Sequence, residues 1–306
     1  MKIIFMGTPD FSVPTLEKLY KEADIEISYV VTKADMKSSR GQRINFSDVK
    51  KKALELNLNI LQPIKIKEDR EVIEKIKKTE PDFIIVVAYG QILSKEILDI
   101  PKYACINGHA SLLPRYRGAS PIQSAILNGD EITGTTTMLM DEGLDTGDIL
   151  LQEKIVIDKK ETSETLFNKL SYLTADAILE TIKDFENIKR VRQNDSLASK
   201  SVIIKKEFGK INFSTESKAS VDRKVRAYTP WPSAYIDVSG VQYKIWDIDI
   251  CDGVSETNKA LKFSDDIFIQ DNKLYARCKD GIIEIKEIQK SGKNRMKSRD
   301  FINGLK

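Results

Sequence analysis

KIIFMGTPDFSVPTLEKLY, residues 2–20, is the stretch that decides the fold class. Residues 2–6 form a short apolar run that closes on Gly7. After Pro9 the apolar side chains, with Leu16 and Leu19 among them, recur at helical spacing. This pattern predicts a strand, a glycine turn and a helix.

The same alternation continues through the first half of the chain. Several of the apolar runs are too hydrophobic to leave one face in water, which indicates a mostly parallel sheet covered by helices on both sides. The fold class is therefore α/β. The expected strands are residues 27–31, 58–61, 82–88 and 103–109, followed by a strand pair at 134–140 and 148–157. The expected helices are residues 46–56, 68–78, 120–128 and 164–187.

The pattern changes near residue 193. Residues 193–207 lose periodicity and predict a surface linker between a first domain, 1–192, and a second domain, 208–306. The second domain begins with a helical pattern at 217–228. Short strands with turn residues between them then predict a small barrel or sandwich. These strands are expected within 234–249 and at 266–269, 274–278 and 282–288.

Composition excludes several classes of protein. The chain has 306 residues, long enough for two domains, and its net charge of +3 does not by itself indicate a nucleic-acid partner. No apolar run reaches the roughly 18 residues of a membrane span, and residues 1–30 do not have the pattern of a signal peptide, so we expect a cytoplasmic protein. Three widely spaced cysteines and one histidine argue against a disulfide framework and against a zinc site, and we expect no metal.

The single histidine, His109, lies at the end of a predicted strand. Because strand side chains alternate, Asn107 and His109 project to the same side, at the strand end where open α/β sheets bind ligands. A second loop, 140–148, places Asp145 after another strand. An amide donor, an imidazole and a carboxylate are the groups that acyl transfer to an amine requires.

Spacing alone leaves other interpretations open. A lone histidine is more often structural than catalytic, Asn107 could cap a turn, and the loop of Asp145 could be a plain acidic turn. The turn GTPDF, residues 7–11, lacks a full GxGxxG pattern, so a dinucleotide-dependent oxidoreductase is disfavoured.

Over nearly its whole length the sequence resembles the methionyl-tRNA formyltransferase family. The motifs are GTPDFSVP at 7–14, Asn107 and His109 with SLLP at 111–114, RG at 117–118 with PIQ at 121–123, MDEGLDTGD at 140–148, TPWPSAY at 229–235, DG at 280–281 and GKNRM at 292–296. The Asn, His and Asp core and the SLLP loop are shared with other formyltetrahydrofolate-using enzymes. The C-terminal motifs and the loop after the second strand indicate the tRNA member.

The resemblance implies a Rossmann-like catalytic domain and a C-terminal OB-like β-barrel that holds RNA. The implied reaction moves a formyl group from 10-formyltetrahydrofolate, a co-substrate, to the α-amine of methionine on initiator tRNA. Asn107 would stabilise the oxyanion, His109 would move the proton, and Asp145 would hold the imidazole. The implied folate wall consists of Ser111, Leu112, Leu113 and Pro114, with Tyr89, Gly90, Gln91, Ile92 and Leu93 opposite; for Ile92, Leu93 and Leu112, ordinary core packing is the alternative.

Gly108 departs from the family pattern, which usually has a β-branched residue between the catalytic Asn and His. Glycine loosens a strand by about 0.5–1 kcal/mol. We therefore expect Gly108→Val to raise thermal stability slightly and to leave activity intact or improved.

Two local basic segments fit contact with an extended polyanion. Residues 33–52 and 286–306 each hold seven basic and two acidic side chains. Solvated helix faces and a frayed tail are the alternative interpretation. The resemblance implies that the loop of the first segment inserts at the acceptor end of the tRNA. The residues expected to contact tRNA are Lys37, Arg40, Arg43, Lys206, Lys293 and Arg295.

Two rival functions stay open. A formyltransferase for a nucleotide-linked amino sugar shares the reaction class, and the basic C-terminal barrel disfavours it. A non-catalytic RNA-binding protein with a relic folate site is disfavoured by the intact Asn107, His109 and Asp145. We expect a monomer with initiator methionyl-tRNA and the folate as partners.

Overall fold

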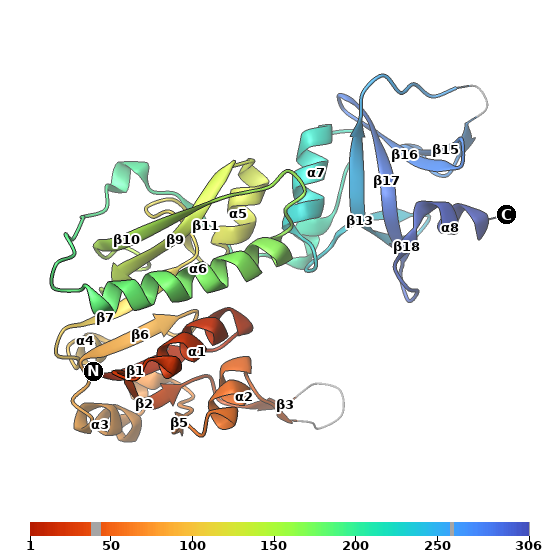
Figure 1. Cartoon of the computed structure of the whole chain (residues 1–306). Helices are drawn as coiled ribbons and strands as arrows, with labels where there is room; N and C mark the ends of the chain where they lie inside the picture. The colour runs from red at the N-terminus through yellow and green to blue at the C-terminus, as the bar shows by residue number, and fades with distance from the viewer. Residues whose placement is uncertain (38–43, 258–259, 306) are drawn as a thin grey trace. The chain divides into compact units, whose positions relative to one another are not determined.

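A computed structural model describes residues 1–37, 44–257 and 260–305 (Figure 1). The chain divides into two compact units, which are described separately below. The first comprises residues 1–121, 132–156 and 167–201, and the second comprises 122–131, 157–166 and 202–306. No helix among the described residues is long and apolar enough to cross a membrane.

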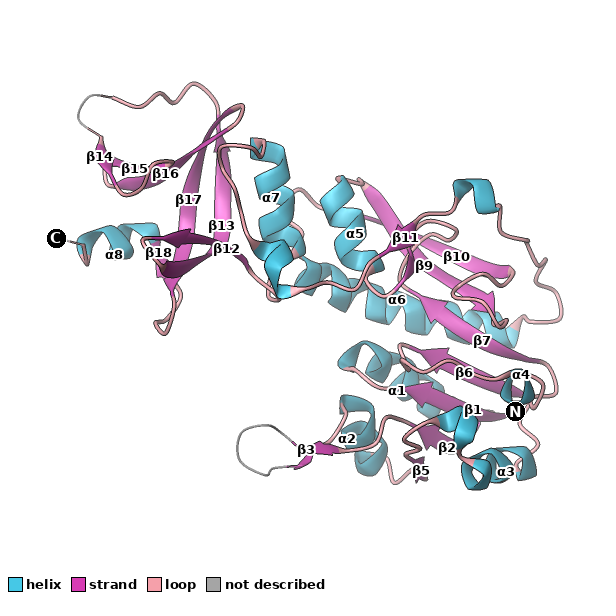
Figure 2. Ribbon diagram, turned by 180° about the vertical axis from the view of Figure 1, so that it is seen from behind, coloured by secondary structure: helices cyan, strands magenta, loops and turns pink. Residues whose placement is uncertain are grey.

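Within the described residues, a seven-stranded sheet forms the centre of the first unit, in the order β10-β9-β7-β6-β1-β2-β5 (Figure 2). The five strands from β7 to β5 are parallel, and β9 and β10 are antiparallel to their neighbours. The predicted α/β class with a mostly parallel sheet is confirmed. The strands are β1 (Lys2–Gly7), β2 (Glu26–Val31), β5 (Ile60–Leu61), β6 (Phe83–Val87), β7 (Ala104–His109), β9 (Ile132–Leu139) and β10 (Ile149–Val156).

Helices cover both faces of this sheet. On one face, Ile84 and Cys105 pack with Ile73 of α3 and Ile97 of α4 in one buried cluster. On the other face α6 approaches Gly108 of β7. The described helices of this unit are η1 (Asp10–Ser12), α1 (Val13–Lys21), α2 (Asp48–Glu55), η2 (Ile66–Glu68), α3 (Arg70–Lys78), α4 (Lys95–Leu98), most of α6 (Ser163–Lys183) and η3 (Asp195–Leu197).

Helix ends differ slightly from the expected ones. α3 begins at Arg70 because the Asp69 side chain accepts a hydrogen bond from the Val72 N–H at 3.1 Å and so caps the helix. α6 ends at Lys183, four residues before the predicted end. Beyond α6, Phe185 is buried edge-on against Phe83, with ring centroids 5.0 Å apart.

The packing around Gly108 overturns the stability expectation for this residue. A Cβ atom on Gly108 would lie 2.5 Å from Thr174 Cγ2, closer than any real contact. Thr174 is fully buried, and its hydroxyl is hydrogen-bonded to the Thr135 hydroxyl at 2.8 Å, so its methyl group cannot easily move. The backbone here has adapted to glycine, and Gly108→Val would overpack the contact between sheet and helix.

An antiparallel sheet forms the second unit, curled around a core that includes Val221, Ile245, Ile283 and Phe301. Its order is β12-β13-β17-β16-β15-β14, with β18 paired to β17, so the predicted small barrel is an open one. Its elements are α5 (Pro121–Asn128), η4 (Lys206–Gly209), α7 (Lys218–Ala227), β12 (Ala234–Val238), β13 (Val241–Cys251), β14 (Leu261–Lys262), β15 (Ile267–Gln270), β16 (Lys273–Cys278), β17 (Gly281–Lys290), β18 (Met296–Lys297) and α8 (Ser298–Asn303).

Short elements appear where the sequence shows no periodicity. Within 193–207 the chain forms η3 (Asp195–Leu197) and β11 (Lys200–Ser201), and β11 pairs in parallel with β8 (Arg117–Gly118). The basic segment contains β3 (Met36–Lys37) paired with β4 (Ile44–Asn45). The domain boundaries and the linker at 193–207 stay a prediction.

Candidate active site

His109 is the last residue of β7 and is only 7% exposed. Its Nε2 lies 3.0 Å from the carbonyl oxygen of Tyr116. A carbonyl only accepts hydrogen bonds, so this contact places a ring proton on Nε2. Nδ1 faces the Asp145 carboxylate, with Oδ2 at 3.7 Å.

Asp145 lies in the loop between β9 and β10 and has a left-handed backbone conformation, with φ of +55°. Its Oδ2 accepts a hydrogen bond from the Gly118 N–H at 2.8 Å. The loop is closed by Asp141, whose carboxylate accepts hydrogen bonds from the Thr146 hydroxyl at 2.7 Å and from the Gly143 N–H at 2.9 Å. These contacts hold the Asp145 carboxylate beside the imidazole.

Asn107 shares its strand face with His109 and is partly exposed. In parallel register β7 aligns Asn107 with Val86, on the face covered by α3 and α4 and opposite α6. Its side-chain amide makes no hydrogen bond with the residues that the structure describes, so both amide protons are available to a ligand. The structure thus brings the three predicted catalytic residues to one end of the sheet.

The predicted folate wall after β7 is held rigidly by hydrogen bonds. The Ser111 hydroxyl donates to the Arg115 carbonyl at 2.6 Å. The Thr136 hydroxyl donates to the Ser111 carbonyl at 2.6 Å and accepts from the Leu113 N–H at 3.1 Å. Ser111 and Leu113 are buried, whereas Leu112 and Pro114 are partly exposed. The latter two side chains are therefore the accessible ones.

The opposite wall, residues 89–93, likewise consists of some buried and some accessible side chains. Tyr89 and Leu93 are 1% and 3% exposed and belong to the core under α3 and α4. Burial raises the pKa of the Tyr89 phenol, which keeps it neutral. Gln91 accepts from the Ile66 N–H at 2.8 Å, and Gly90 has a φ of +77°. Only Ile92, which is 77% exposed, presents a large apolar side chain to solvent.

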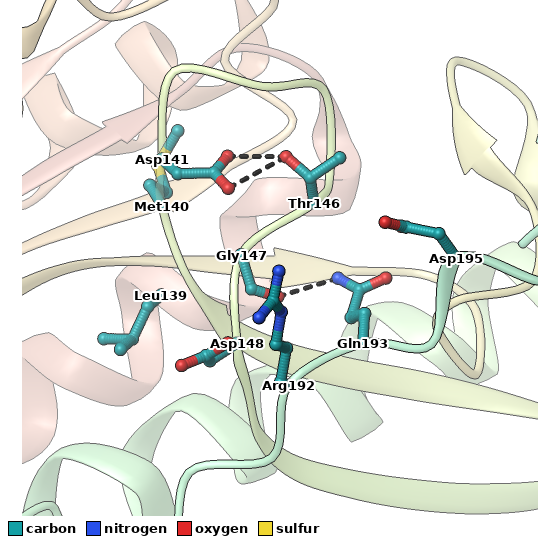
Figure 3. A pocket seen from close by; sticks show the side chains of 9 residues that line it. All are labelled: Leu139, Met140, Asp141, Thr146, Gly147, Asp148, Arg192, Gln193 and Asp195. Carbon is teal, nitrogen blue, oxygen red and sulfur yellow. Dashed lines mark hydrogen bonds between the residues drawn. The ribbon is translucent and has the colours of Figure 1, made fainter.

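A cavity of about 450 Å³ lies beside the Asp145 loop (Figure 3). None of the three predicted catalytic residues lines it in the described part of the chain. Two charged groups of opposite sign, Arg192 and Asp148, are among the side chains that surround it. Its lining residues are Leu139, Met140, Asp141, Thr146, Gly147, Asp148, Arg192, Gln193 and Asp195.

The residues expected to contact tRNA are only partly described. Arg40 and Arg43 lie outside the described residues, and so does the side chain of Lys37. Lys206 and Lys293 are exposed in the second unit. Arg295 forms an ion pair with Glu287 and lies over the Trp246 ring, 5.0 Å from its centroid.

Sequence reasoning did not assign a role to Gln193 or to the Arg117 side chain. Both are buried, and the guanidinium donates to Gln193 Oε1 from Nε at 3.0 Å and from Nη2 at 2.8 Å. Arg117 stands in a motif of the resemblance, but Gln193 lies in a polar stretch that has the pattern of a linker. No local signal distinguishes a buried polar pair from two solvated side chains.

Comparison with known proteins defines the class first. Residues 1–182 match the formyl transferase family, and residues 203–306 match the formyl transferase C-terminal domain. The methionyl-tRNA formyltransferase of Clostridium tetani is 44% identical over 310 residues, which cover 100% of this chain and 97% of that protein. That of Clostridium acetobutylicum is 44% identical over 306 residues, covering 99% and 96%. The chain belongs to the methionyl-tRNA formyltransferase family.

Solved structures agree with the fold. A sugar 3N-formyl transferase, WlaRD, crystallised in the presence of dTDP and 5-N-formyl-THF, has a TM-score of 0.66 and 21% identity, with 96% of this chain and 99% of that chain covered. The methionyl-tRNA formyltransferase from Clostridium thermocellum has a TM-score of 0.59 and 20% identity, with 83% and 95% covered. At these identities the likeness shows the fold alone.

Proposed function

We propose that this protein transfers the formyl group of 10-formyltetrahydrofolate to the α-amino group of methionine on initiator tRNA. The family membership supports the two substrates. The observation that carries the chemistry is the arrangement at the end of β7, where the Asn107 amide lies on the same strand face as His109 and makes no hydrogen bond with the described part of the chain.

Each residue then has one role. The amine attacks the formyl carbon, and the N–H groups of Asn107 donate to the oxyanion that develops on the formyl oxygen. Since Nε2 of His109 is bonded to the Tyr116 carbonyl, Nδ1 is the nitrogen that accepts the amine proton. The Asp145 carboxylate, 3.7 Å from Nδ1, stabilises the imidazolium that results. The bond from the formyl carbon to the folate nitrogen breaks as the oxyanion collapses, and the leaving nitrogen takes up the proton from the His109 imidazolium, which returns to its neutral form.

The folate lies against the partly exposed Leu112 and Pro114 on one side and Ile92 on the other. Their exposed apolar surface suits a flat heterocycle. Buried members of the two walls, such as Ser111 and Tyr89, hold the walls in shape. The remaining wall residues, Gly90, Gln91, Leu93 and Leu113, act through the backbone or through packing.

The tRNA is held by basic side chains of both basic segments and of the second unit. Lys206 and Lys293 are exposed, which supports contact with phosphate. Arg295 beside Trp246 offers a cation and an aromatic face together. Lys37, Arg40 and Arg43 complete the proposed set.

Mass detection of a formyl group on charged initiator tRNA tests this function. We expect formylation that requires both the esterified methionine and 10-formyltetrahydrofolate. Uncharged initiator tRNA, free methionine and a nucleotide-linked amino sugar serve as controls. Faster transfer to the amino sugar than to the charged tRNA would overturn the proposal.

A further inference from the structure

Gln193 is 6% exposed and lies behind the loop that carries Asp145. Its Nε2 donates to two carbonyl oxygens of that loop, that of Asp145 at 2.9 Å and that of Gly147 at 2.8 Å. Figure 3 shows the second of these hydrogen bonds. Its Oε1 accepts the two hydrogen bonds from Arg117. Every hydrogen-bonding atom of the side-chain amide is thus used.

The two ends of the Gln193 amide cannot be exchanged. The guanidinium of Arg117 can only donate, so it must face Oε1, and carbonyl oxygens can only accept, so they must face the NH₂ group. Among side chains of this size, glutamine alone supplies both an acceptor oxygen and two N–H donors. Glutamate would keep the contact with Arg117 and would lose both donors to the loop.

Gln193 also connects the Asp145 loop and β8, the two segments that surround His109. Its NH₂ group holds the backbone of Asp145, and its oxygen holds Arg117, the neighbour of Gly118 in the chain. The Gly118 N–H in turn holds the Asp145 carboxylate at 2.8 Å. The Gln193 amide therefore constrains Asp145 in two ways. It binds the Asp145 backbone carbonyl directly, and through Arg117 and Gly118 of β8 it holds the Asp145 carboxylate in place.

Residues 199–201 keep β8 in place. The Arg117 N–H donates to the Ser199 carbonyl at 2.9 Å, and the Tyr116 N–H donates to the Ser199 hydroxyl at 2.9 Å. A Cβ atom on Gly118 would lie 2.9 Å from the carbonyl oxygen of Ser201, so β11 and β8 are in close contact. The Tyr116 carbonyl, which bonds His109 Nε2, belongs to this same fixed segment.

We propose that Gln193 is a positioning residue for formyl transfer, which sets the Asp145 carboxylate against His109 Nδ1 through its two hydrogen bonds to the Asp145 loop. The expected loss of turnover rests on the proposed function, whereas the expected shift of the Asp145 carboxylate does not. Misplacing a catalytic group by about 1 Å can cost roughly 100-fold in rate. A shift of Asp145 would therefore lower turnover while leaving the binding surfaces for both substrates in place.

Three substitutions separate the contacts. Gln193→Glu retains the acceptor for Arg117 and removes the donors to the loop, and Gln193→Met fills a similar volume without any polar contact. Asp195→Ala is the matched control, because Asp195 is the other partner of Arg117 at 2.8 Å, and its side chain is 81% exposed. Cooperative unfolding of each variant establishes that it is folded.

Formylation of charged initiator tRNA gives the first readout. We expect Gln193→Glu and Gln193→Met to lower kcat by about 10- to 100-fold, with the KM for charged tRNA within about twofold of the wild type. Asp195→Ala should be close to the wild type in both. An unchanged kcat in Gln193→Glu, or an equal loss in Asp195→Ala, would overturn the proposal.

Because the chain has one histidine, NMR of ¹⁵N-histidine-labelled protein without substrates gives a second readout. We expect the ring signals of Gln193→Glu to move away from the wild-type positions toward those of Asp145→Asn. Ring signals that coincide with the wild type, even with a loss of turnover, contradict positioning through Asp145. If the wild type fails to formylate charged tRNA, the proposed function fails, and the NMR comparison still decides the role of Gln193.

Discussion

Thr174 of α6 occupies the space that a side chain on Gly108 of β7 would need, with its Cγ2 atom 2.5 Å from the ideal Cβ position. Gly108→Val should therefore destabilise the protein by about 1–3 kcal/mol through overpacking. Urea unfolding measures this as a lower midpoint at unchanged slope.

The matched test of this packing is the double variant Gly108→Ala with Thr174→Ser. Serine removes the methyl group and retains the hydroxyl that bonds Thr135, so the pair should be more stable than Gly108→Ala alone. A double variant no more stable than Gly108→Ala would show that strain in the strand, and not the Thr174 methyl group, limits this position.

Replacing Asn107, His109 or Asp145 by alanine should lower turnover far more than tRNA affinity. One oxyanion donor is worth about 100- to 1,000-fold in turnover, and loss of the proton acceptor or of its carboxylate removes stabilisation of the same transition state. Steady-state kinetics together with a separate tRNA-binding measurement checks this. Near-normal turnover in any one variant contradicts the role assigned to that residue.

Ile92→Ala should raise the KM for 10-formyltetrahydrofolate by about 10-fold or more, because an apolar contact of this size is worth roughly 1–3 kcal/mol. The KM for charged tRNA should not change. Ile203→Ala is the matched control, since Ile203 is 74% exposed against 77% for Ile92 and lies outside the folate wall. Equal effects of the two substitutions would remove Ile92 from the proposed site.

Arg40→Ala and Arg43→Ala should weaken charged-tRNA binding at physiological salt and leave folate binding unchanged. Guanidinium groups pair with phosphate, and each lost phosphate contact flattens the salt dependence of binding by roughly one unit. Binding measured across a salt series tests this, with exposed Lys78 of α3 replaced by alanine as control. Parallel salt curves for wild type and both arginine variants would contradict a role in RNA contact.

Cys105 should resist alkylation in the folded protein at pH 8. Burial, with a smaller contribution from the negative charge of Asp99, raises the pKa of the Cys105 thiol to about 12. The reactive thiolate is therefore scarce at pH 8. Peptide mass spectrometry after iodoacetamide treatment should show labelling of Cys105 in urea and almost none without it. Equal labelling rates in both conditions would show that β7 opens readily.

The fold class was predictable because burial on both faces of a sheet leaves a direct pattern in the chain. The apolar run 82–88 contains β6, and the helical spacing at 217–228 contains α7. The antiparallel pair β3 and β4 and the short helix α8 were not predicted. β3 and β4 have two residues each and α8 has six, less than two helical turns, so none of them contains a recognisable period.

The candidate site was predictable where it depends on position along one strand. Strand alternation and the ligand-binding end of an α/β sheet place Asn107 and His109 together, and no tertiary contact is needed for that inference. The Tyr116 carbonyl that assigns the proton of His109 is a different case. It lies in a loop whose path depends on Ser199, 83 positions later in the chain.

By itself, the sequence determined the order of the longer strands and helices, the α/β class and the strand that carries Asn107 and His109, because these depend on local periodicity. Tertiary structure alone decided that Gly108 must be glycine, since the obstacle is a methyl group on α6. It also decided that Gln193 reaches Asp145 and Arg117, which are 48 and 76 positions away. Buried polar contacts form between residues that are far apart in the chain, and a polar side chain has the same local pattern whether it faces water or a partner.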